Sequence, residues 1–146
     1  MAKETFKSTA KLVKGMKVEC TARNHKFIMD EPKELGGTDE GMNPVEALLC
    51  ALGSCKCIVA SCNARAKRID LQEIWNELER VLDPDGFQGK NPDAKIGYQS
   101  ITSKIHIKSN SPKEDIEKFV EFIDKTCPIA DTLENSPELF TEIIYE

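Results

Sequence analysis

Apolar and polar residues alternate along the first part of the chain, on both sides of Gly15. A period of two is typical of half-buried strands, so residues 5–22 predict a β-hairpin that turns at this glycine. A turn at Asn24 and a short third strand over residues 26–29 are expected next. Residues 30–42 are rich in proline, glycine and acidic side chains, which is the composition of a loop.

The apolar pattern changes to a helical period at residue 43. Asn43 suits an N-cap, Pro44 suits the first helical position, and Glu46 stands where a capping box places its acid. The helix is predicted to continue to about Lys67. Its first half is apolar on nearly every face, so we expect it to be buried on nearly all sides. The buried stripe is Val45, Leu48, Leu49, Leu52, Cys55, Val59, Cys62 and Ala66.

Two further segments differ in how clearly their pattern can be interpreted. Residues 69–83 match a helical face better than strict alternation, so periodicity alone predicts a helix there. Residues 98–109 alternate cleanly between apolar and polar side chains. This second pattern predicts a strand with one solvent-facing side.

The last third of the chain predicts two helices and a closing strand. The sequence from Ser111 repeats the capping signature, and its apolar spacing predicts a helix that ends near Thr126. Cys127 and Pro128 are expected to be the cap and first residue of a short helix to about Asn135. The β-rich residues 139–145 predict a final extended segment.

Composition limits the class of protein. A chain of 146 residues with 40% hydrophobic and 31% charged side chains suits one compact domain, residues 1–146. The first residues carry mixed charges with no apolar run, so we expect neither a signal peptide nor a membrane span, and a cytoplasmic protein. The net charge is −5 without a lysine or arginine cluster, which argues against nucleic acid as a partner.

Six cysteines raise the question of disulfide, metal or redox chemistry. Cytosolic thiols stay reduced, so packing, metal binding and catalysis are the candidate roles. Cys55 and Cys57 point about 200° apart on one helix and cannot share an ion, which disfavours a metal site even with Cys62 nearby. His25 and His106 have no recognisable nucleophile beside them and are expected at the surface.

Local sequence leaves the roles of Cys55 and Cys127 open. Cys127 at a helix N-cap lies near the positive end of the helix dipole and near unpaired N–H groups, which favour a thiolate. A small residue that merely suits the cap is an equally good interpretation. Cys55 on a buried stripe is, taken alone, more typical of core packing.

Three motifs together resemble the OsmC/Ohr family of osmotically inducible and organic-hydroperoxide-resistance proteins. They are D-E-P-x-x-L-G-G-x-D-x-G-M at residues 30–42, N-P-V-E-A-L-L-x-A-L-G-S-C at residues 43–55 and T-C-P-I-A-D-T-L at residues 126–133. The resemblance spans nearly the whole chain. It implies an α+β fold with antiparallel sheets around a long central helix, and an intertwined homodimer with active sites at its interface. It also implies a strand over residues 69–83, and we adopt that expectation.

The resemblance assigns roles to the cysteines. It implies that Cys55 is the peroxidatic thiol and Cys127 the resolving thiol of an organic-hydroperoxide reductase. Helix geometry leaves Cys62 as an alternative resolver, because it lies two turns below Cys55 on the same face. The thiolate would be oxidised to a sulfenic acid that condenses to a disulfide, and a dithiol would reopen it. In the family this reductant is typically of lipoyl type. Neither a cofactor nor a metal ion is expected.

The sequence departs from the peroxidase pattern in one place. Peroxidase members read N-P-E where this chain has Val45, and Glu46 points about 100° away. This variant resembles the OsmC-like branch more than the hydroperoxide-resistance branch. Arg23 is the candidate arginine that stabilises the Cys55 thiolate. The alternative is a non-enzymatic module that binds a small molecule or senses redox state.

Overall fold

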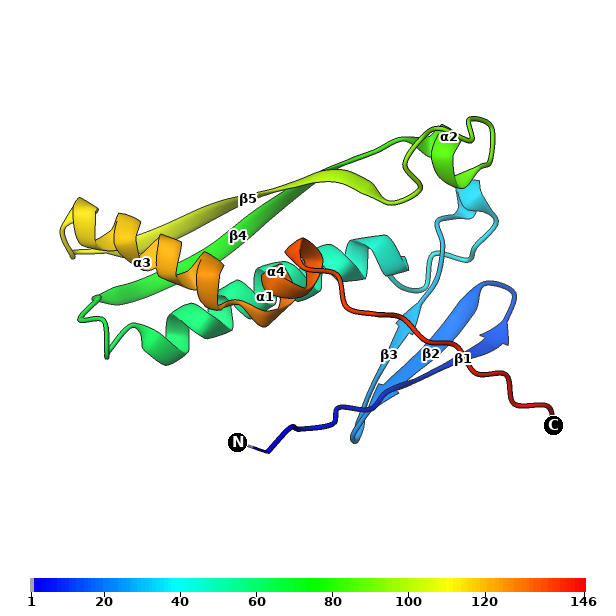
Figure 1. The fold of residues 1–146 in the computed structure, drawn as a ribbon, viewed down its shortest axis with the longest axis horizontal. Helices are drawn as coiled ribbons and strands as arrows, with labels where there is room; N and C mark the ends of the chain where they lie inside the picture. Colours follow the sequence, from blue (N-terminus) through cyan, green and yellow to red (C-terminus); the bar gives the residue numbers. More distant parts are fainter. Residues whose placement is uncertain (1) are drawn as a thin grey trace. The chain divides into compact units, whose positions relative to one another are not determined.

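The computed structural model describes residues 2–146, and its chain forms two compact units, residues 1–50 and 51–146. Figure 1 shows the elements in sequence order, coloured from the N-terminus to the C-terminus. A long helix begins in the first unit and ends in the second. Each unit has its own sheet and is described by itself.

The first unit contains a three-stranded antiparallel sheet in the order β1-β2-β3. The strands are β1 (Thr9–Lys14), β2 (Lys17–Ala22) and β3 (His25–Met29). Gly15 has a φ of 57° at the first turn, a left-handed conformation that glycine adopts without steric cost. Arg23 has a φ of 55° at the second turn. The predicted hairpin and third strand are confirmed.

The loop after β3 is organised around the buried carboxylate of Asp30. This carboxylate accepts hydrogen bonds from the backbone N–H groups of Glu31, Thr38 and Glu40 and from the Thr38 hydroxyl. These donors, with the Thr38 hydroxyl first, lower the pKa of Asp30 to about 2. A short 3-10 helix, η1 (Lys33–Leu35), lies within the loop. The loop is therefore held in one conformation up to the start of the long helix.

The long helix α1 (Pro44–Asn63) begins with the predicted capping box. The Glu46 N–H donates to Asn43 Oδ1 at 2.9 Å, and the Asn43 N–H donates to Glu46 Oε2 at 2.9 Å. The helix ends four residues before the expected Lys67. Arg68, with a φ of 57°, turns the chain towards the next strand.

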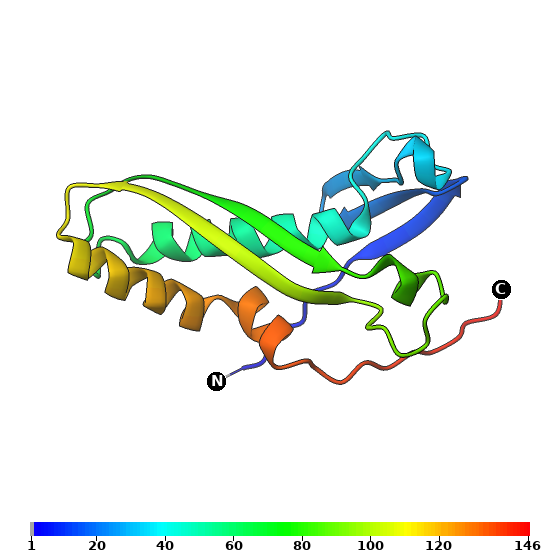
Figure 2. The same cartoon turned by 90° about the horizontal axis from the view of Figure 1, so that it is seen from above.

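The second unit is built on a two-stranded antiparallel sheet with helices against one face. Its strands are β4 (Leu71–Leu82) and β5 (Tyr98–Ser109), and its further helices are α2 (Pro84–Phe87), α3 (Lys113–Thr126) and α4 (Pro128–Glu134). Figure 2 shows the two long strands side by side, crossing in front of α1. The strand that the family resemblance implied for residues 69–83 is confirmed, and the helix that periodicity predicted there is wrong.

The side chains of β4 explain why its pattern resembled a helix. Ile74 and Leu78 face the helices, whereas Trp75 and Val81 lie on the solvent-facing side and are 52% and 53% exposed. Large apolar residues therefore occur on both faces of this strand. Strict alternation is lost in the sequence although the backbone is extended. The neighbouring strand β5 has the predicted single wet face.

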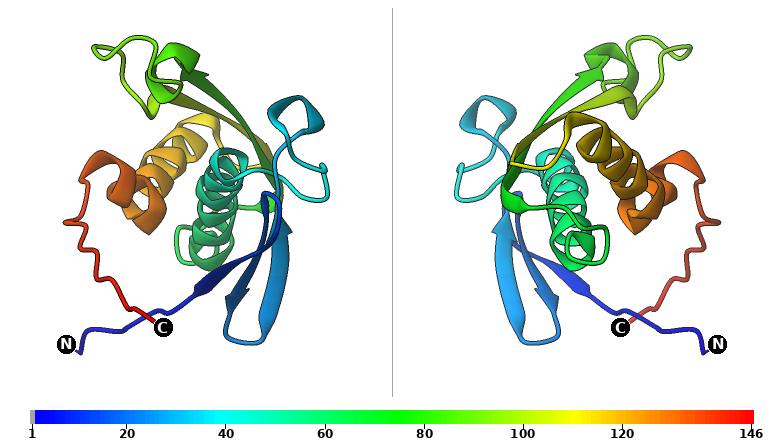
Figure 3. Two further views of the ribbon diagram at one scale, coloured as in Figure 1. Left: turned by 90° about the vertical axis from the view of Figure 1, so that its right-hand side faces the viewer. Right: turned by 90° about the vertical axis from the view of Figure 1, so that its left-hand side faces the viewer.

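One hydrophobic cluster joins α1, α3 and the inner face of β4. Its buried members are Ala60, Ala64, Ile69, Phe119 and Ile123. Figure 3 shows α1 and α3 packed on the same side of the β4–β5 pair. Small side chains on α1 let the helix approach its neighbours closely, since alanine has no side chain beyond Cβ.

The start of α3 differs from the expected capping box. The N-cap is Pro112, and no side chain caps the helix. The Ser111 hydroxyl instead accepts a hydrogen bond from the Asp70 N–H at 2.9 Å. This bond links the residue before β4 to the turn after β5.

The C-terminal residues 136–146 form neither helix nor strand, so the predicted strand over residues 139–145 is wrong for the single chain. A strand needs a neighbouring edge for its hydrogen bonds, and this segment has no ladder partner among the described residues. Its large apolar side chains are exposed. They are Leu139, Phe140, Ile143, Ile144 and Tyr145.

Helix α1 is less enclosed than its sequence predicted. In its first half, Val45 is 36% and Leu48 is 38% exposed, although that half was expected to be buried on nearly all sides. In its second half, Ile58 and Cys62, the latter a member of the predicted buried stripe, are exposed. By length and apolar composition, its 20 residues could cross a bilayer, which by itself is weak evidence because the core helix of a soluble protein passes the same test. Its packing against α3 and β4 is that of a core helix with one uncovered face.

Candidate active site

Cys55 and Cys127 meet in a second apolar cluster of the second unit. Cys127 is fully buried at the N-cap of α4, and Cys55 is half-buried on α1. The Cys55 thiol shares a hydrogen bond with the Cys127 sulfur. Both residues are free thiols. The cluster around them consists of Leu52, Val59, Leu78, Ile101, Ile129 and Ala130.

The first turn of α4 supplies hydrogen-bond donors to both sulfurs. The first N–H groups of a helix have no partner within the helix. Here the Ile129 N–H donates to the Cys55 sulfur, and the Ala130 N–H donates to Cys127 Sγ at 3.4 Å. Pro128 occupies the first helical position, where its missing N–H costs nothing. Two adjacent backbone donors therefore point to the two thiols.

Burial nevertheless raises the pKa of Cys55 above its ordinary value. Desolvation of the thiolate is the largest cause, and the hydrogen bond to Cys127 acts in the same direction. The Ile129 N–H opposes both. The thiolate is the nucleophilic form of cysteine. Within this unit, the described groups around Cys55 therefore favour the neutral thiol at pH 7.

Arg23 is in the first unit, at the exposed turn between β2 and β3. It lines an open groove of about 860 Å³ together with Ala22 and residues 5–8. The structure thus brings together two of the three predicted site residues, Cys55 and Cys127, within one unit. The role of Arg23 stays a prediction.

Neither Cys57 nor Cys62 belongs to the cluster around Cys55 and Cys127. Cys57 Sγ accepts a hydrogen bond from Asn76 Nδ2 at 3.1 Å, and the same amide group donates to the Gly53 carbonyl at 3.1 Å. Cys62, the alternative resolver, is exposed. Because Cys127 contacts Cys55, it is favoured over Cys62 as the resolving thiol. Among residues 2–146, no group of three histidine, cysteine or acidic side chains is placed to hold a metal ion.

Lys56 is a polar residue of the site region that sequence reasoning did not single out. It is only 8% exposed although it is charged. Its Nζ donates to Ser103 Oγ at 3.0 Å and lies 2.9 Å from Asp124 Oδ1. The available signal was a lysine inside the most apolar stretch of the chain, directly after Cys55.

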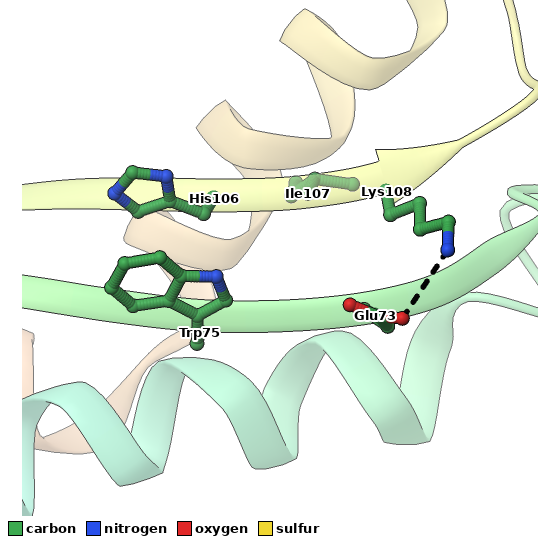
Figure 4. Close-up of a pocket in the computed structure, with 5 residues that line it drawn as sticks. All are labelled: Glu73, Trp75, His106, Ile107 and Lys108. Atoms are coloured by element: carbon green, nitrogen blue, oxygen red, sulfur yellow. Dashed lines mark hydrogen bonds and ion pairs between the residues drawn. The ribbon is translucent and has the colours of Figure 1, made fainter.

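The outer face of the β4–β5 pair carries a separate shallow pocket of about 200 Å³ (Figure 4). Trp75 and His106 stack there with ring centroids 3.8 Å apart, and Lys108 forms an ion pair with Glu73 at 3.3 Å. His106 Nε2 also lies 2.6 Å from Glu77 Oε2. No cysteine lines this pocket, and its polar side chains pair with one another across the strands.

Comparison with known proteins finds relatives that cover most of the chain. A hydroperoxide reductase of Mycoplasma genitalium is 29% identical over 127 residues, which covers 86% of this chain and 84% of that protein. The crystal structure of an OsmC-like protein from Mycoplasma pneumoniae superposes with a TM-score of 0.81 at 24% identity, covering 92% of this chain and 91% of that chain.

An organic hydroperoxide resistance protein OsmC from Legionella pneumophila also has this fold, with a TM-score of 0.68 at 20% identity and coverage of 92% of this chain and 93% of that chain. The sequence model of the OsmC-like protein family matches residues 37–142. This match includes α1, both long strands and both cysteines of the site. The chain therefore belongs to the OsmC-like protein family.

Proposed function

We propose that this protein reduces organic hydroperoxides with Cys55 as the peroxidatic thiol and Cys127 as the resolving thiol. The observation that carries the proposal is the hydrogen-bonded contact of these two thiols in an apolar cluster at the first turn of α4. The relatives from Mycoplasma genitalium and Mycoplasma pneumoniae that are named hydroperoxide reductases support the same activity.

The reaction balances with two thiols and one external dithiol. The Cys55 thiolate attacks one peroxide oxygen, so that an S–O bond forms, the O–O bond breaks and the alkoxide leaves as an alcohol after it takes a proton. The Cys127 sulfur then attacks the sulfenic acid at Cys55, which forms the S–S bond and releases water. A dithiol, of the lipoyl type in this proposal, reduces the disulfide by exchange and is itself oxidised.

The surroundings of the thiols favour an organic substrate. Leu52, Leu78 and Ile101 lie against Cys55 and Cys127. Apolar walls bind the hydrocarbon part of an alkyl or aryl hydroperoxide and offer little to hydrogen peroxide. We therefore expect a higher kcat/KM for cumene hydroperoxide than for hydrogen peroxide.

Formation of the thiolate needs a cation in addition to the groups around Cys55. Burial raises its pKa, and only one backbone donor, the Ile129 N–H, acts against this. Arg23 is our proposed source, either from the same chain or from a second copy. Val45 stands where a glutamate would orient such an arginine in the peroxidase pattern, so we expect a weaker thiolate than in that branch.

A cytoplasmic homodimer completes the proposal. The β4–β5 pair has two strands and hence two open edges, which sheet proteins normally cover. Ile58 on α1 and the apolar side chains of residues 139–145 are exposed in the single chain. A second copy would cover apolar surface of this kind. Free thiols suit the reducing cytoplasm.

One assay tests the activity. The reduced protein is mixed with cumene hydroperoxide, the Cys55–Cys127 disulfide is sought by mass spectrometry, and turnover is followed with dihydrolipoamide. We expect the disulfide and continuous peroxide consumption. Absence of reaction at both cysteines would overturn the proposal.

The second candidate is a redox-sensing module, favoured by Val45, which stands where the peroxidase pattern has a glutamate to orient the arginine. It predicts a different outcome of the same assay. A sensor would be oxidised once per chain and would then stop, even with dihydrolipoamide present. A reductase would consume many equivalents of peroxide.

A further inference from the structure

We propose that Lys56 is a positioning residue, which ties the end of α3 to α1 and so keeps Cys127 within bonding distance of Cys55. The inference rests on the proposed function, because it concerns how that thiol pair is held for disulfide formation. It assigns Lys56 no contact with the substrate. It also makes the Lys56–Asp124 ion pair part of the resolving step.

The bonds of Lys56 connect three elements of the second unit. Its Nζ lies 2.9 Å from Asp124 Oδ1 on α3 and donates to Ser103 Oγ on β5 at 3.0 Å. Lys56 itself is on α1, directly after Cys55. The Lys56 side chain is 10% exposed, whereas that of Asp124 is 51% exposed. Among the eight ion pairs found in residues 2–146, Lys56 is the most buried cation.

The position of Asp124 determines the position of Cys127. Asp124 is in the last turn of α3, and the helix ends at the residue before Cys127. The Cys127 N–H donates to the Ile123 carbonyl at 3.0 Å, and Ile123 is fully buried. Three residues of helical backbone joined by such a bond move as one body. A bond that holds Asp124 therefore also restrains Cys127.

The charge of Lys56 does not serve the Cys55 thiolate. Adjacent helix residues point about 100° apart, so the two side chains leave α1 in different directions. The pKa of Cys55 is shifted by burial, by the Ile129 N–H and by Cys127. The Lys56 charge is instead neutralised by Asp124. We therefore assign Lys56 no part in activating Cys55. Its proposed role is to position Cys127.

An ion pair whose lysine is buried and whose aspartate is half-exposed adds little net stability compared with apolar packing, but it restricts which groups can meet. Without it, α3 and α4 could move relative to α1 while the apolar clusters persist. The two sulfurs would then spend less time within bonding distance, and the effective concentration of the Cys127 thiol would fall. A sulfenic acid that waits longer at Cys55 is open to a second peroxide, which oxidises it to the sulfinic acid.

The test measures how readily Cys55 and Cys127 form a disulfide, first at equilibrium and then during oxidation by peroxide. The parent protein and Lys56→Met are equilibrated in glutathione redox buffers without peroxide, and mass spectrometry gives the fraction with the Cys55–Cys127 disulfide. We expect the effective concentration of the pair to fall about fivefold to tenfold in Lys56→Met. In a second measurement with excess cumene hydroperoxide, the share of Cys55 found as sulfinic acid should rise. In Lys56→Arg, which keeps the positive charge, both the effective concentration and the sulfinic acid share should be close to those of the parent.

Two controls separate positioning from general loss of stability. Lys118→Met breaks an ion pair of the same 2.9 Å length on α3, with Glu114, but at the surface. It should leave both measurements unchanged. Asn43→Ala removes the cap of α1 in the first unit and should lower stability without changing the thiol pair. If Lys56→Met does not fold, Asp124→Ala replaces it and is expected to change both measurements in the same direction, since it removes the contact between α1 and α3 while Lys56 keeps its hydrogen bond to Ser103 Oγ.

The outcomes distinguish this inference from the proposed function. A folded Lys56→Met with the disulfide fraction and sulfinic share of the parent overturns the positioning role and leaves the reductase proposal intact. A parent protein that forms no Cys55–Cys127 disulfide in either measurement overturns the reductase mechanism, and the positioning role with it. Equal effects of Lys56→Met and Asn43→Ala would show that stability alone is responsible.

Discussion

Asp30 and Cys55 are both acids removed from water, but their pKa values move in opposite directions. Asp30 is 2% exposed, and its pKa is lowered to about 2. Cys55 is half-buried, and its pKa is raised. Burial disfavours the charged form of both groups. The difference must therefore come from the hydrogen-bond donors around them.

The donors differ in number and kind. Asp30 accepts three backbone N–H groups and the Thr38 hydroxyl, and together these outweigh desolvation. Cys55 accepts one backbone N–H, from Ile129, and its neighbour Cys127 favours the neutral thiol. The Asp30 carboxylate is thus stabilised as an anion by its donors, and these bonds hold the loop in place. The Cys55 thiolate has too few donors to offset its desolvation, so the proposed reaction requires a further group that stabilises it.

The largest effect is expected from removal of the Cys55 sulfur. Cys55→Ser should reduce the turnover of cumene hydroperoxide by at least about a thousandfold, because the reaction oxidises sulfur to a sulfenic acid and a serine hydroxyl cannot be oxidised in this way. Peroxide consumption with dihydrolipoamide measures this. Cys50→Ser and Cys62→Ser, which change exposed thiols on the same helix, are the matched controls. Turnover in Cys55→Ser at the parental rate would disprove its role as the nucleophile.

The pH dependence of Cys55 alkylation tests whether Arg23 stabilises its thiolate. A thiol with a raised pKa is mostly protonated at pH 7, so the rate with iodoacetamide should rise about tenfold per pH unit until the pKa is reached. If Arg23 stabilises the thiolate, Arg23→Met should shift this profile to higher pH. Arg23→Lys should lie between the two. Superimposed profiles of the parent and Arg23→Met would exclude Arg23.

Asp30 provides the opposite test. Its folded pKa of about 2 is below the unfolded value, so its contribution to stability is complete above about pH 4 and is lost as the pH falls towards 2. Asp30→Asn should lower the melting temperature at pH 7 and show a smaller further loss between pH 4 and pH 2. Thermal melts across this range measure both effects. Glu34→Gln, at an exposed position of the same loop, should leave the acid transition of the parent unchanged.

The smallest effect is expected at the start of α1, where donors and acceptors are already matched. Asn43→Ala removes the acceptor of the Glu46 N–H and should cost about 1 kcal/mol in the free energy of unfolding. Urea titration measures this loss. Glu46→Gln keeps an oxygen that can accept from the Asn43 N–H and should cost less. A loss in Glu46→Gln as large as in Asn43→Ala would contradict the reciprocal cap.

Much of the fold was predictable because its signals are short-range. The hairpin at Gly15, the cap at Asn43 and the helix start at Pro128 each depend on a few neighbouring residues, and all three were predicted. β4 was misread by periodicity because Trp75 and Val81 place apolar side chains on its solvent face. Only the resemblance to the family gave this strand correctly.

The candidate site was predicted in part. Motifs identified Cys55 and Cys127, which are 72 residues apart in sequence, but no local pattern shows that the Ile129 N–H reaches the Cys55 sulfur. The burial of Lys56 was equally invisible, because it depends on Ser103 and Asp124 from two other elements. Contacts of this kind arise only when distant segments pack together.

The sequence by itself determined where most elements begin, which cysteines to consider and which family the chain resembles, because capping, turn and motif residues act within a few positions. The tertiary structure alone decided that the two thiols touch, that burial raises the pKa of Cys55, and that Lys56 pairs with Asp124. These depend on desolvation and on side chains brought together from α1, β5, α3 and α4. Burial and long-range pairing are properties of the packed chain, so they have no signature in any single stretch of it.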